Sequence, residues 1–345
     1  MEVLQMEELP NDVAPRQGGK LQNQTIPQSP AMADSSFMFG ITINADGTVT
    51  RIDPLPRTTA SPNPHDPSLV PSKDVSVNLD LGTGVRLYVP PNPPSGKKLP
   101  LIVYIHGGGF VYLSAATTVI HDFCSLMATS LMAVVASVEY RLAPEHRLPA
   151  AYDDALEVLR WIRTSNEEWL DRFADLSSCY LMGSSAGGNI AYNVGLRVCD
   201  NETTPASLEP VKIKGLIAHG PFFGGSIRTD SELRLFEDKA LPVAKAEFLW
   251  KLSLPVGADR DHEYCNPNSG HNSSGHARMK SLKWKVMVIG GHGDPLIGRQ
   301  KEFANMLVER GIEVMAYFNE HGHAAEMCDV GKACELLEKI KQFIM

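Results

Sequence analysis

The sequence predicts an α/β fold in which a mostly parallel central sheet is flanked by helices. The first observation is that short apolar runs alternate with segments of helical periodicity from about residue 75 to the end of the chain. The second is that the middle runs are continuously apolar, which is typical of strands covered on both faces. Because crossovers between parallel strands are right-handed, this alternation places helices on both sides of one sheet.

Strands are expected from the N-terminal third of the chain onwards. Two short ones should flank a turn in the segment NADGTVTRI, residues 44–52, and a connector rich in Pro, Ser and Asn follows at residues 54–71. The central sheet should then contain, in chain order, Val75–Leu79, Val85–Val89, Leu101–Ile105, Ala133–Val138, Cys179–Met182, Ile213–Ile217, Lys285–Ile289 and Glu313–Phe318.

Helices are expected between these strands. The segment AGGNIAYNVGLRV, residues 186–198, should form a helix directly after the strand that begins at Cys179. Another is expected at Gln300–Arg310, where Gly311 provides a favourable C-terminal stop. The last helix, Lys332–Ile344, carries apolar residues at helical spacing: Leu336, Leu337, Ile340, Phe343 and Ile344.

The pattern also predicts the domain organisation. Residues 1–34 are polar, rich in Pro, Gln and Gly and without periodicity, which predicts a disordered leader before a single domain at residues 35–345. A second possible translation start, Met32, lies within the leader. Residues 220–280 interrupt the strand–helix rhythm with many polar residues and glycines, so we expect an insertion over the strand ends rather than another sheet layer.

Charge and composition exclude several function classes. The chain has a net charge of −8 and no Lys/Arg-rich run, which argues against nucleic acid or an anionic membrane as a partner. No apolar run reaches the roughly 18 residues that span a bilayer. The N-terminus lacks the signature of a secretory signal, which predicts a cytoplasmic location. We expect a monomer or a homodimer. The six cysteines form no CxxC pair, which predicts free thiols and no metal site.

The segment GSSAG at residues 183–187 fits the pattern G-x-S-x-G, with Ser185 at its centre. It lies between an expected strand and an expected helix. A strand-to-helix turn this tight needs small residues beside the nucleophile, and it exposes the serine oxygen at the carboxyl end of the sheet. The pattern alone also fits an ordinary Gly/Ser turn, but its position favours a nucleophile.

A glycine triplet, Gly107, Gly108 and Gly109, follows His106 directly after the apolar strand LIVYI. Such a loop lets backbone N–H groups approach a substrate oxygen, and the N–H of Ala186, next to the serine, would be a further donor. Donors fixed where negative charge develops stabilise the transition state. A phosphate-binding loop is the competing interpretation, but the sequence contains neither GxxxxGK[ST] nor a G-x-G-x-x-G that opens a helix.

An acid and a base follow the serine, each after its own expected strand. Asp294 comes after the strand at Lys285–Ile289, and His321 and His323 come after the final strand. The order Ser185, Asp294, His323 is that of enzymes with a nucleophile elbow. In this arrangement His323 takes the serine proton, and Asp294 orients the imidazole and stabilises its charged form.

Six stretches in chain order carry a resemblance: HGGGF, SVEYRLAPEHRLPAAYDD, GSSAGGN, GADRDHEYCNP, GDPLIGRQ and the late histidine. Over about residues 37–345 the chain resembles plant carboxylesterases of the hormone-sensitive-lipase-like group. The resemblance implies an α/β-hydrolase fold with a cap built from N-terminal residues and the insertion, and a triad at Ser185, Asp294 and His323. It also implies hydrolysis of small esters, such as acetylated plant specialised metabolites, through an acyl-enzyme and without a cofactor.

Three features depart from the pattern of that group. Ser184 replaces the acidic residue that usually precedes the nucleophile, and Glu139 stands where aspartate is common. The tail NEHGHAAE is a residue shorter than in close relatives, which leaves His321 as an alternative base. We favour His323, because the His-Ala pair fits the family pattern.

Two other functions share these motifs. Some relatives catalyse eliminations, dehydrations or cyclisations, which also need a base and an oxyanion site. Gibberellin receptors resemble the same group but have lost the catalytic histidine, whereas this chain has two histidines at the expected place. We therefore expect a serine carboxylesterase, with a lyase as the main alternative and a hormone receptor as the lesser one.

Overall fold

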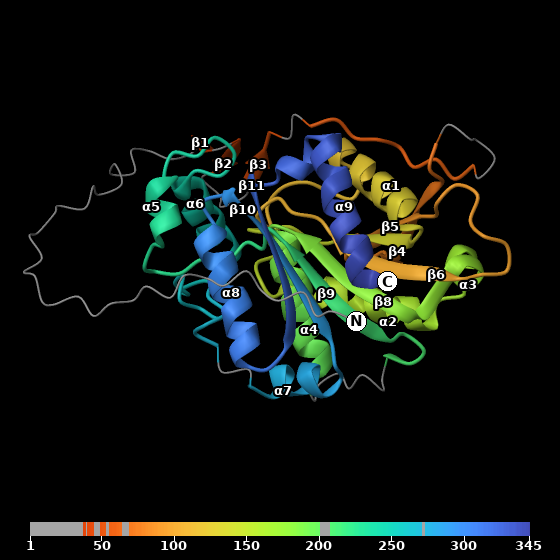
Figure 1. Cartoon of the computed structure of the whole chain (residues 1–345). Helices are drawn as coiled ribbons and strands as arrows, with labels where there is room; N and C mark the ends of the chain where they lie inside the picture. The colour runs from red at the N-terminus through yellow and green to blue at the C-terminus, as the bar shows by residue number, and fades with distance from the viewer. Residues whose placement is uncertain are drawn as a thin grey trace, which may run out of the picture. The chain divides into compact units, whose positions relative to one another are not determined.

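The strands from β4 to β11 form one eight-stranded sheet (Figure 1). The computed structural model describes residues 37–38, 40–44, 49–52, 55–63, 69–200, 208–270 and 273–345, so the leader predicted at 1–34 lies outside the described residues. The eight predicted strands are confirmed, as β4 Ser72–Asn78, β5 Thr83–Tyr88, β6 Leu99–Ile105, β7 Val134–Glu139, β8 Ala174–Ser184, β9 Ile213–His219, β10 Lys285–Gly293 and β11 Glu313–Gly322.

The strands lie in the order β11-β10-β9-β8-β6-β7-β5-β4. The pairs β4–β5 and β5–β7 are antiparallel and every other pair is parallel, as the prediction of a mostly parallel sheet requires. Ile105 at the end of β6 pairs with Gly183 of β8, and Ser184 pairs with His219 at the end of β9. The segments that follow these parallel strands therefore meet at one edge of the sheet.

Helices connect most of these strands. The predicted helices after β8, β10 and β11 are confirmed as α4, α8 and α9, each with slightly different ends from those expected. Within the described residues the helices are α1 Thr118–Leu131, α2 Ala150–Thr164, α3 Glu168–Phe173, α4 Ala186–Cys199, α5 Asp230–Arg234, α6 Val243–Ser253, α7 Ser273–Ser281, α8 Ile297–Glu309 and α9 Val330–Ile344, with a 3₁₀ turn, η2, at Ala325–Met327.

The helices cover both faces of the sheet. On one face, α1 and α9 lie side by side and pack on Ile102 and Tyr104 of β6 and on Met287 of β10 (Figure 1). On the other face, α2, α4 and α8 pack on the alternate residues, such as Leu101 and Val103. Successive residues of a strand point to opposite faces, so continuously apolar strands are buried on both sides.

A second, smaller sheet precedes the large one. It consists of β1 Phe37–Met38, β2 Ile41–Ile43 and β3 Val49–Arg51, which pair antiparallel in that order. The Arg51 guanidinium connects it to the main body by donating to the carbonyl oxygens of Val111 at 2.8 Å and Ala143 at 2.6 Å. The predicted insertion at 220–280 contributes α5, α6 and α7 and contains no strand among its described residues.

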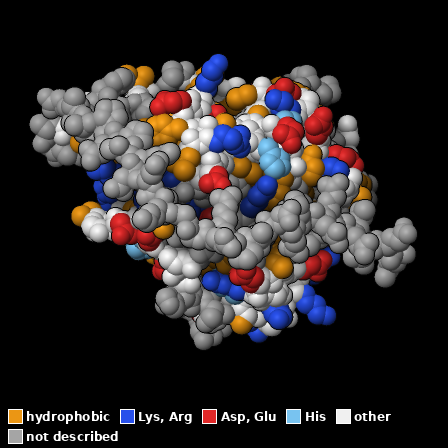
Figure 2. Space-filling view, turned by 60° about the vertical axis from the view of Figure 1, so that its left-hand side comes forward, with side chains coloured by type: hydrophobic (Ala, Val, Ile, Leu, Met, Phe, Trp, Pro, Cys, Tyr) orange, Lys and Arg blue, Asp and Glu red, His pale blue; other side chains and the backbone are white. Residues whose placement is uncertain are grey.

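The described surface is mixed in charge. Figure 2 shows acidic, basic and apolar side chains interspersed on one face, without a region of a single charge sign among the coloured atoms. None of the described helices combines the length and the apolar character that crossing a bilayer would require.

Candidate active site

The turn between β8 and α4 holds Ser185 in a strained backbone conformation. Its φ of 54° and ψ of −118° lie in a region that residues other than glycine rarely adopt. A Cβ on Gly183 would lie 2.0 Å from the Gly187 carbonyl oxygen, and one on Gly187 would lie 1.9 Å from that of Ile105. Both positions therefore need glycine. The Ser185 N–H donates to the His219 carbonyl oxygen at 2.8 Å, which fixes the turn to the end of β9.

The structure brings Ser185, His323 and Asp294 into one hydrogen-bonded chain. Ser185 Oγ lies 2.9 Å from His323 Nε2, and His323 Nδ1 lies 2.8 Å from Asp294 Oδ2. The carboxylate also accepts the Leu296 N–H at 2.8 Å and the Gln300 side-chain amide at 2.8 Å. Because the carboxylate only accepts, Nδ1 of the imidazole carries hydrogen and Nε2 is free to take the serine proton.

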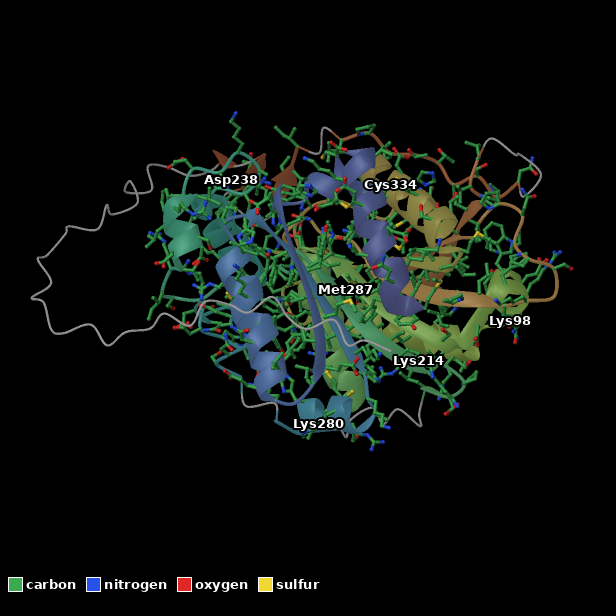
Figure 3. The ribbon with its side chains drawn as sticks, viewed as in Figure 1. Lys98, Lys214, Asp238, Lys280, Met287 and Cys334 are labelled. Atoms are coloured by element: carbon green, nitrogen blue, oxygen red, sulfur yellow. The ribbon has the colours of Figure 1, made fainter. Side chains whose placement is uncertain are left out.

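The charges of this chain support one another. Burial opposes the charged form of Asp294, but the charge and hydrogen bond of His323, with those of Leu296 and Gln300, hold its pKa below the usual range. Burial likewise opposes the charged form of His323, but Asp294 outweighs it and raises the pKa of the imidazole. Asp238 adds to this effect from the insertion, at the end of the sheet opposite Lys98 and Lys214 (Figure 3).

The glycine loop after β6 passes beside the serine. The Cβ that Gly107 lacks would lie 3.2 Å from Ser185 Cβ, so the two residues are in contact. Gly108 and Gly109 have φ values of 103° and 60°, in the left-handed region that favours glycine. In the described part of the chain, no acceptor takes the N–H of Gly108 or Gly109. Ala186 is the first residue of α4, where N–H groups have no partner within the helix.

His106 and Tyr140 support this loop from behind. Nδ1 of His106 lies 2.8 Å from the Gly107 carbonyl oxygen, and the Tyr140 hydroxyl donates to the carbonyl oxygens of His106 and Gly107 at 3.0 Å and 3.2 Å. Burial lowers the pKa of His106 to about 4, so its ring is neutral near pH 7. Glu139, beside Tyr140, accepts the Ala115 N–H at 2.6 Å and so fixes the segment that follows the loop.

Apolar side chains from the insertion contact the glycine loop. A Cβ on Gly109 would lie 2.5 Å from Leu249 Cδ1, so this leucine of α6 packs directly on the loop. The neighbouring Trp250 stacks on Phe222 with ring centroids 4.8 Å apart, and it also contacts Phe110. The insertion therefore forms one apolar wall next to the serine.

The other predicted base, His321, has a different partner. Its Nδ1 lies 2.9 Å from Glu326 Oε1, so the structure places His323, not His321, on the serine. Two further residues, His219 and Glu326, were not predicted as parts of the site. Nδ1 of His219 lies 3.0 Å from Ser184 Oγ, and its Nε2 lies 3.3 Å from Glu326 Oε2. The one hint in the sequence was that Ser184 replaces the usual acid.

Two other kinds of site, a metal centre and a pocket away from Ser185, lack the necessary groups among the described residues. The described residues contain no group of three or more His, Cys, Asp or Glu side chains placed to hold a metal ion. A cavity of about 160 Å³ lies at the far end of α4, but no serine or cysteine lines it; the lining residues are Tyr192, Asn193, Leu196, Arg197, Glu263, Tyr264, Pro267, Gly270, His276 and Arg310. The chemistry therefore points to Ser185.

Comparisons with known proteins show the family to which the chain belongs. Residues 102–327 match the family described as alpha/beta hydrolase fold. Carboxylesterase 20 of Arabidopsis thaliana is 47% identical to the chain, and the match covers 91% of the chain and 97% of the relative. The 3-O-acetylpapaveroxine carboxylesterase CXE2 of Papaver somniferum is 44% identical, over 91% of the chain and 100% of the relative. Among solved structures, an esterase of Pyrobaculum calidifontis superposes with a TM-score of 0.67 and 25% identity, covering 81% of the chain and 86% of the esterase.

Proposed function

The chain belongs to the plant carboxylesterases of the alpha/beta-hydrolase family and is a serine carboxylesterase, and we propose that it removes acetyl groups from small plant metabolites through an acyl-enzyme on Ser185. The observation that carries the proposal is the chain of hydrogen bonds from Ser185 through His323 to Asp294, at 2.9 Å and 2.8 Å. A nucleophile, a base and an orienting acid in contact are what acyl transfer to serine needs.

His323 moves the protons of the reaction. As Ser185 Oγ attacks the ester carbonyl carbon, Nε2 of His323 takes the hydroxyl proton and then gives it to the departing alcohol oxygen. The buried charge of Asp294 stabilises the imidazolium between these two transfers. Water then attacks the acyl-enzyme with help from the same imidazole, which releases the acid and restores the serine.

The glycine loop binds the oxygen that becomes negative. The N–H groups of Gly108 and Gly109, and the N–H of Ala186 at the start of α4, are the donors that we assign to this role, beside Gly107, which contacts the serine. Donors held in place by the backbone need no reorganisation as charge develops, so they stabilise the tetrahedral oxyanion more than the ester.

The acetyl group is proposed from two observations. The poppy relative is named for an acetylated compound, 3-O-acetylpapaveroxine. In the present chain, Leu249 packs directly on Gly109, and Trp250 and Phe222 close the same side. This apolar wall limits the space beside the glycine loop and favours a short acyl group. We propose that the reaction uses no cofactor and takes place in the cytoplasm, with the protein as a monomer or a homodimer.

The experiment that tests this proposal is the capture of the acyl-enzyme. The protein is mixed with an acetylated alkaloid or with 4-nitrophenyl acetate, quenched in acid and weighed intact by mass spectrometry. We expect an acetyl adduct that peptide mapping assigns to Ser185 and that the variant Ser185→Ala lacks. Water enriched in ¹⁸O should label the released acid.

The same experiment distinguishes hydrolysis from elimination. An elimination needs the base but forms no acyl-enzyme, so it would give an unsaturated product without adduct or label. An adduct on the neighbouring Ser184 would contradict the assignment of the nucleophile.

A further inference from the structure

A second row of polar side chains lies behind the nucleophile. The buried Tyr104 hydroxyl donates to Ser184 Oγ at 3.1 Å, and Ser184 Oγ lies 3.0 Å from His219 Nδ1. Nε2 of His219 lies 3.3 Å from Glu326 Oε2. Because Ser184 accepts from Tyr104, its own proton goes to Nδ1 of the imidazole, and His219 donates through Nε2 to the carboxylate. One neutral tautomer of His219 thus satisfies the whole row.

Glu326 also holds the segment that carries the base. Its Oε1 accepts the Asn319 side-chain amide at 3.1 Å and faces His321 Nδ1 at 2.9 Å. His323 lies in the chain between His321 and Glu326, so the residues on both sides of the base meet at one carboxylate. This carboxylate is 4% exposed, and the loop between β11 and η2 therefore cannot move without breaking buried, charge-assisted hydrogen bonds.

The carboxylate is negatively charged where it lies. Burial opposes the charge, but the hydrogen bonds that Glu326 accepts from His219 and His321 outweigh it and hold its pKa far below the usual range. The titratable groups that face Glu326 are His219 at the end of β9 and His321 in β11. Those that act on His323 are Asp294, Asp238 and Glu326 itself, and all three raise its pKa against the effect of burial.

A second nucleophile at Ser184 does not fit this geometry. The Ser184 side chain is almost fully buried, with 4% of its surface exposed, so an ester carbonyl has no access to it. Its hydroxyl already joins Tyr104 to His219. The row therefore acts on the catalytic chain and not beside it.

We propose that Glu326 is a positioning residue that keeps His323 in register with Ser185, and that His219 and Ser184 connect it to the nucleophile strand. This inference rests on the proposed function. It also accounts for Ser184: an acid there would place a second carboxylate on His219, which already faces Glu326, and the hydroxyl instead completes the row without a second charge.

The test compares three variants by their activity on 4-nitrophenyl acetate. Glu326→Ala removes every bond of the carboxylate, and Glu326→Gln keeps the shape but has only one acceptor oxygen for two sets of donors. Glu320→Ala is the matched control, because Glu320 is an exposed acid of the same strand segment. We expect kcat to fall by between about 10-fold and about 100-fold for Ala, by less for Gln, and to stay unchanged for the control.

The pH profile separates positioning of the base from a general loss of stability. Removing the charge of Glu326 lowers the pKa of His323, so the acid limb of kcat/KM moves to lower pH in Glu326→Gln and stays in place in Glu320→Ala. Titration of active serines with a 4-nitrophenyl phosphonate expresses kcat per folded site. A loss that disappears after this correction, with an unmoved acid limb, would overturn the inference.

A fourth variant, at His219, covers the case in which the Glu326 variants do not fold. His219→Asn keeps a polar atom near Ser184 but cannot reach Glu326, so it removes that contact alone. We expect a smaller fall in kcat; a value per site equal to that of the wild type overturns the inference. If the phosphonate does not label Ser185 of the wild-type protein and this protein hydrolyses no ester, the proposed function itself fails. This outcome differs from a loss of activity that is confined to the variants.

Discussion

Two buried carboxylates lie in this site, and they hold their histidines in different ways. Asp294 is 2% exposed and points at the imidazole that touches the nucleophile, with a backbone N–H and the amide of Gln300 on its other lone pairs. Glu326 is 4% exposed and faces the imidazole rings of His219 and His321, neither of which is hydrogen-bonded to the Ser185 hydroxyl. The first acts on the charge of the base, whereas the second acts mainly on where the base is.

The difference follows from the elements that carry the two residues. Asp294 stands between β10 and α8, so a strand end and a helix start fix its backbone. Glu326 stands in the short turn η2, after Ala324 with a left-handed φ of 57°, and has no long element of its own. Its position depends on the side chains that it binds. We therefore expect loss of Asp294 to damage chemistry and loss of Glu326 to damage geometry.

The largest expected effect follows loss of the nucleophile, and the residual activity of that variant is the lower limit against which the other variants are compared. Ser185→Ala should lower kcat for short-chain esters by about 10⁶-fold, because the acyl-enzyme cannot form. The fold should persist, since the alanine methyl fits where the serine side chain lies. Ester hydrolysis and circular dichroism of the same sample check both statements. Retention of more than about a tenth of the activity would rule out Ser185 as the nucleophile.

The histidine partners of the two carboxylates should differ almost as widely. His323→Ala should reach the same lower limit as the serine variant, because the base is gone. His321→Ala removes one bond of Glu326 and should cost no more than about 10-fold. Single-turnover assays of both variants on one ester decide between them. If His321→Ala is the inactive variant, the base has been assigned to the wrong residue.

Removal of the Asp294 charge should have the next largest effect. Asp294→Asn should lower kcat by about 10⁴-fold, because the amide no longer selects the tautomer of His323 or stabilises its charged form. Burial lowers the pKa of His323, but the charge and hydrogen bond of Asp294 outweigh this effect and raise it. The pKa of His323 should therefore fall when the charge of Asp294 is lost. The acid limb of the remaining activity should therefore move to lower pH. An unmoved limb would contradict the role assigned to Asp294.

The sequence predicted the sheet and the Asp294 side of the site because both depend on local constraints. Gly183 and Gly187 are required by contacts within a few residues or with the adjacent strand, so they appear as a recognisable pattern. The order of nucleophile, acid and base follows from the order of the parallel strands. These features are visible without knowing the distances between remote segments.

The Glu326 side of the site could not be predicted in the same way. His219 and Glu326 are 107 residues apart, and no local pattern requires either of them. The only hint in the sequence was Ser184, which stands where the resembling group usually has an acid and so suggested that another residue supplies the carboxylate. The helices of the insertion were also not placed, although Thr229 and Glu232 form a capping box that marks the start of α5.

The smallest expected effect concerns the amides that support the two carboxylates. Gln300→Met keeps the volume of a fully buried side chain but removes the hydrogen bond to Asp294. Asn319→Ala removes the corresponding bond to Glu326.

The two variants should differ in size and in pH dependence. A hydrogen bond to a charged group contributes about 1.5–3 kcal/mol. Because Asp294 acts directly on His323, we expect Gln300→Met to lower kcat by about 10-fold and to move the acid limb. Asn319→Ala should lower kcat by only a few-fold and leave the limb in place, since His219 and His321 still hold Glu326. Initial rates between pH 5 and pH 9, expressed per phosphonate-titrated serine, would show the contrast. Equal shifts of the limb in both variants would mean that the two carboxylates act on the base in the same way.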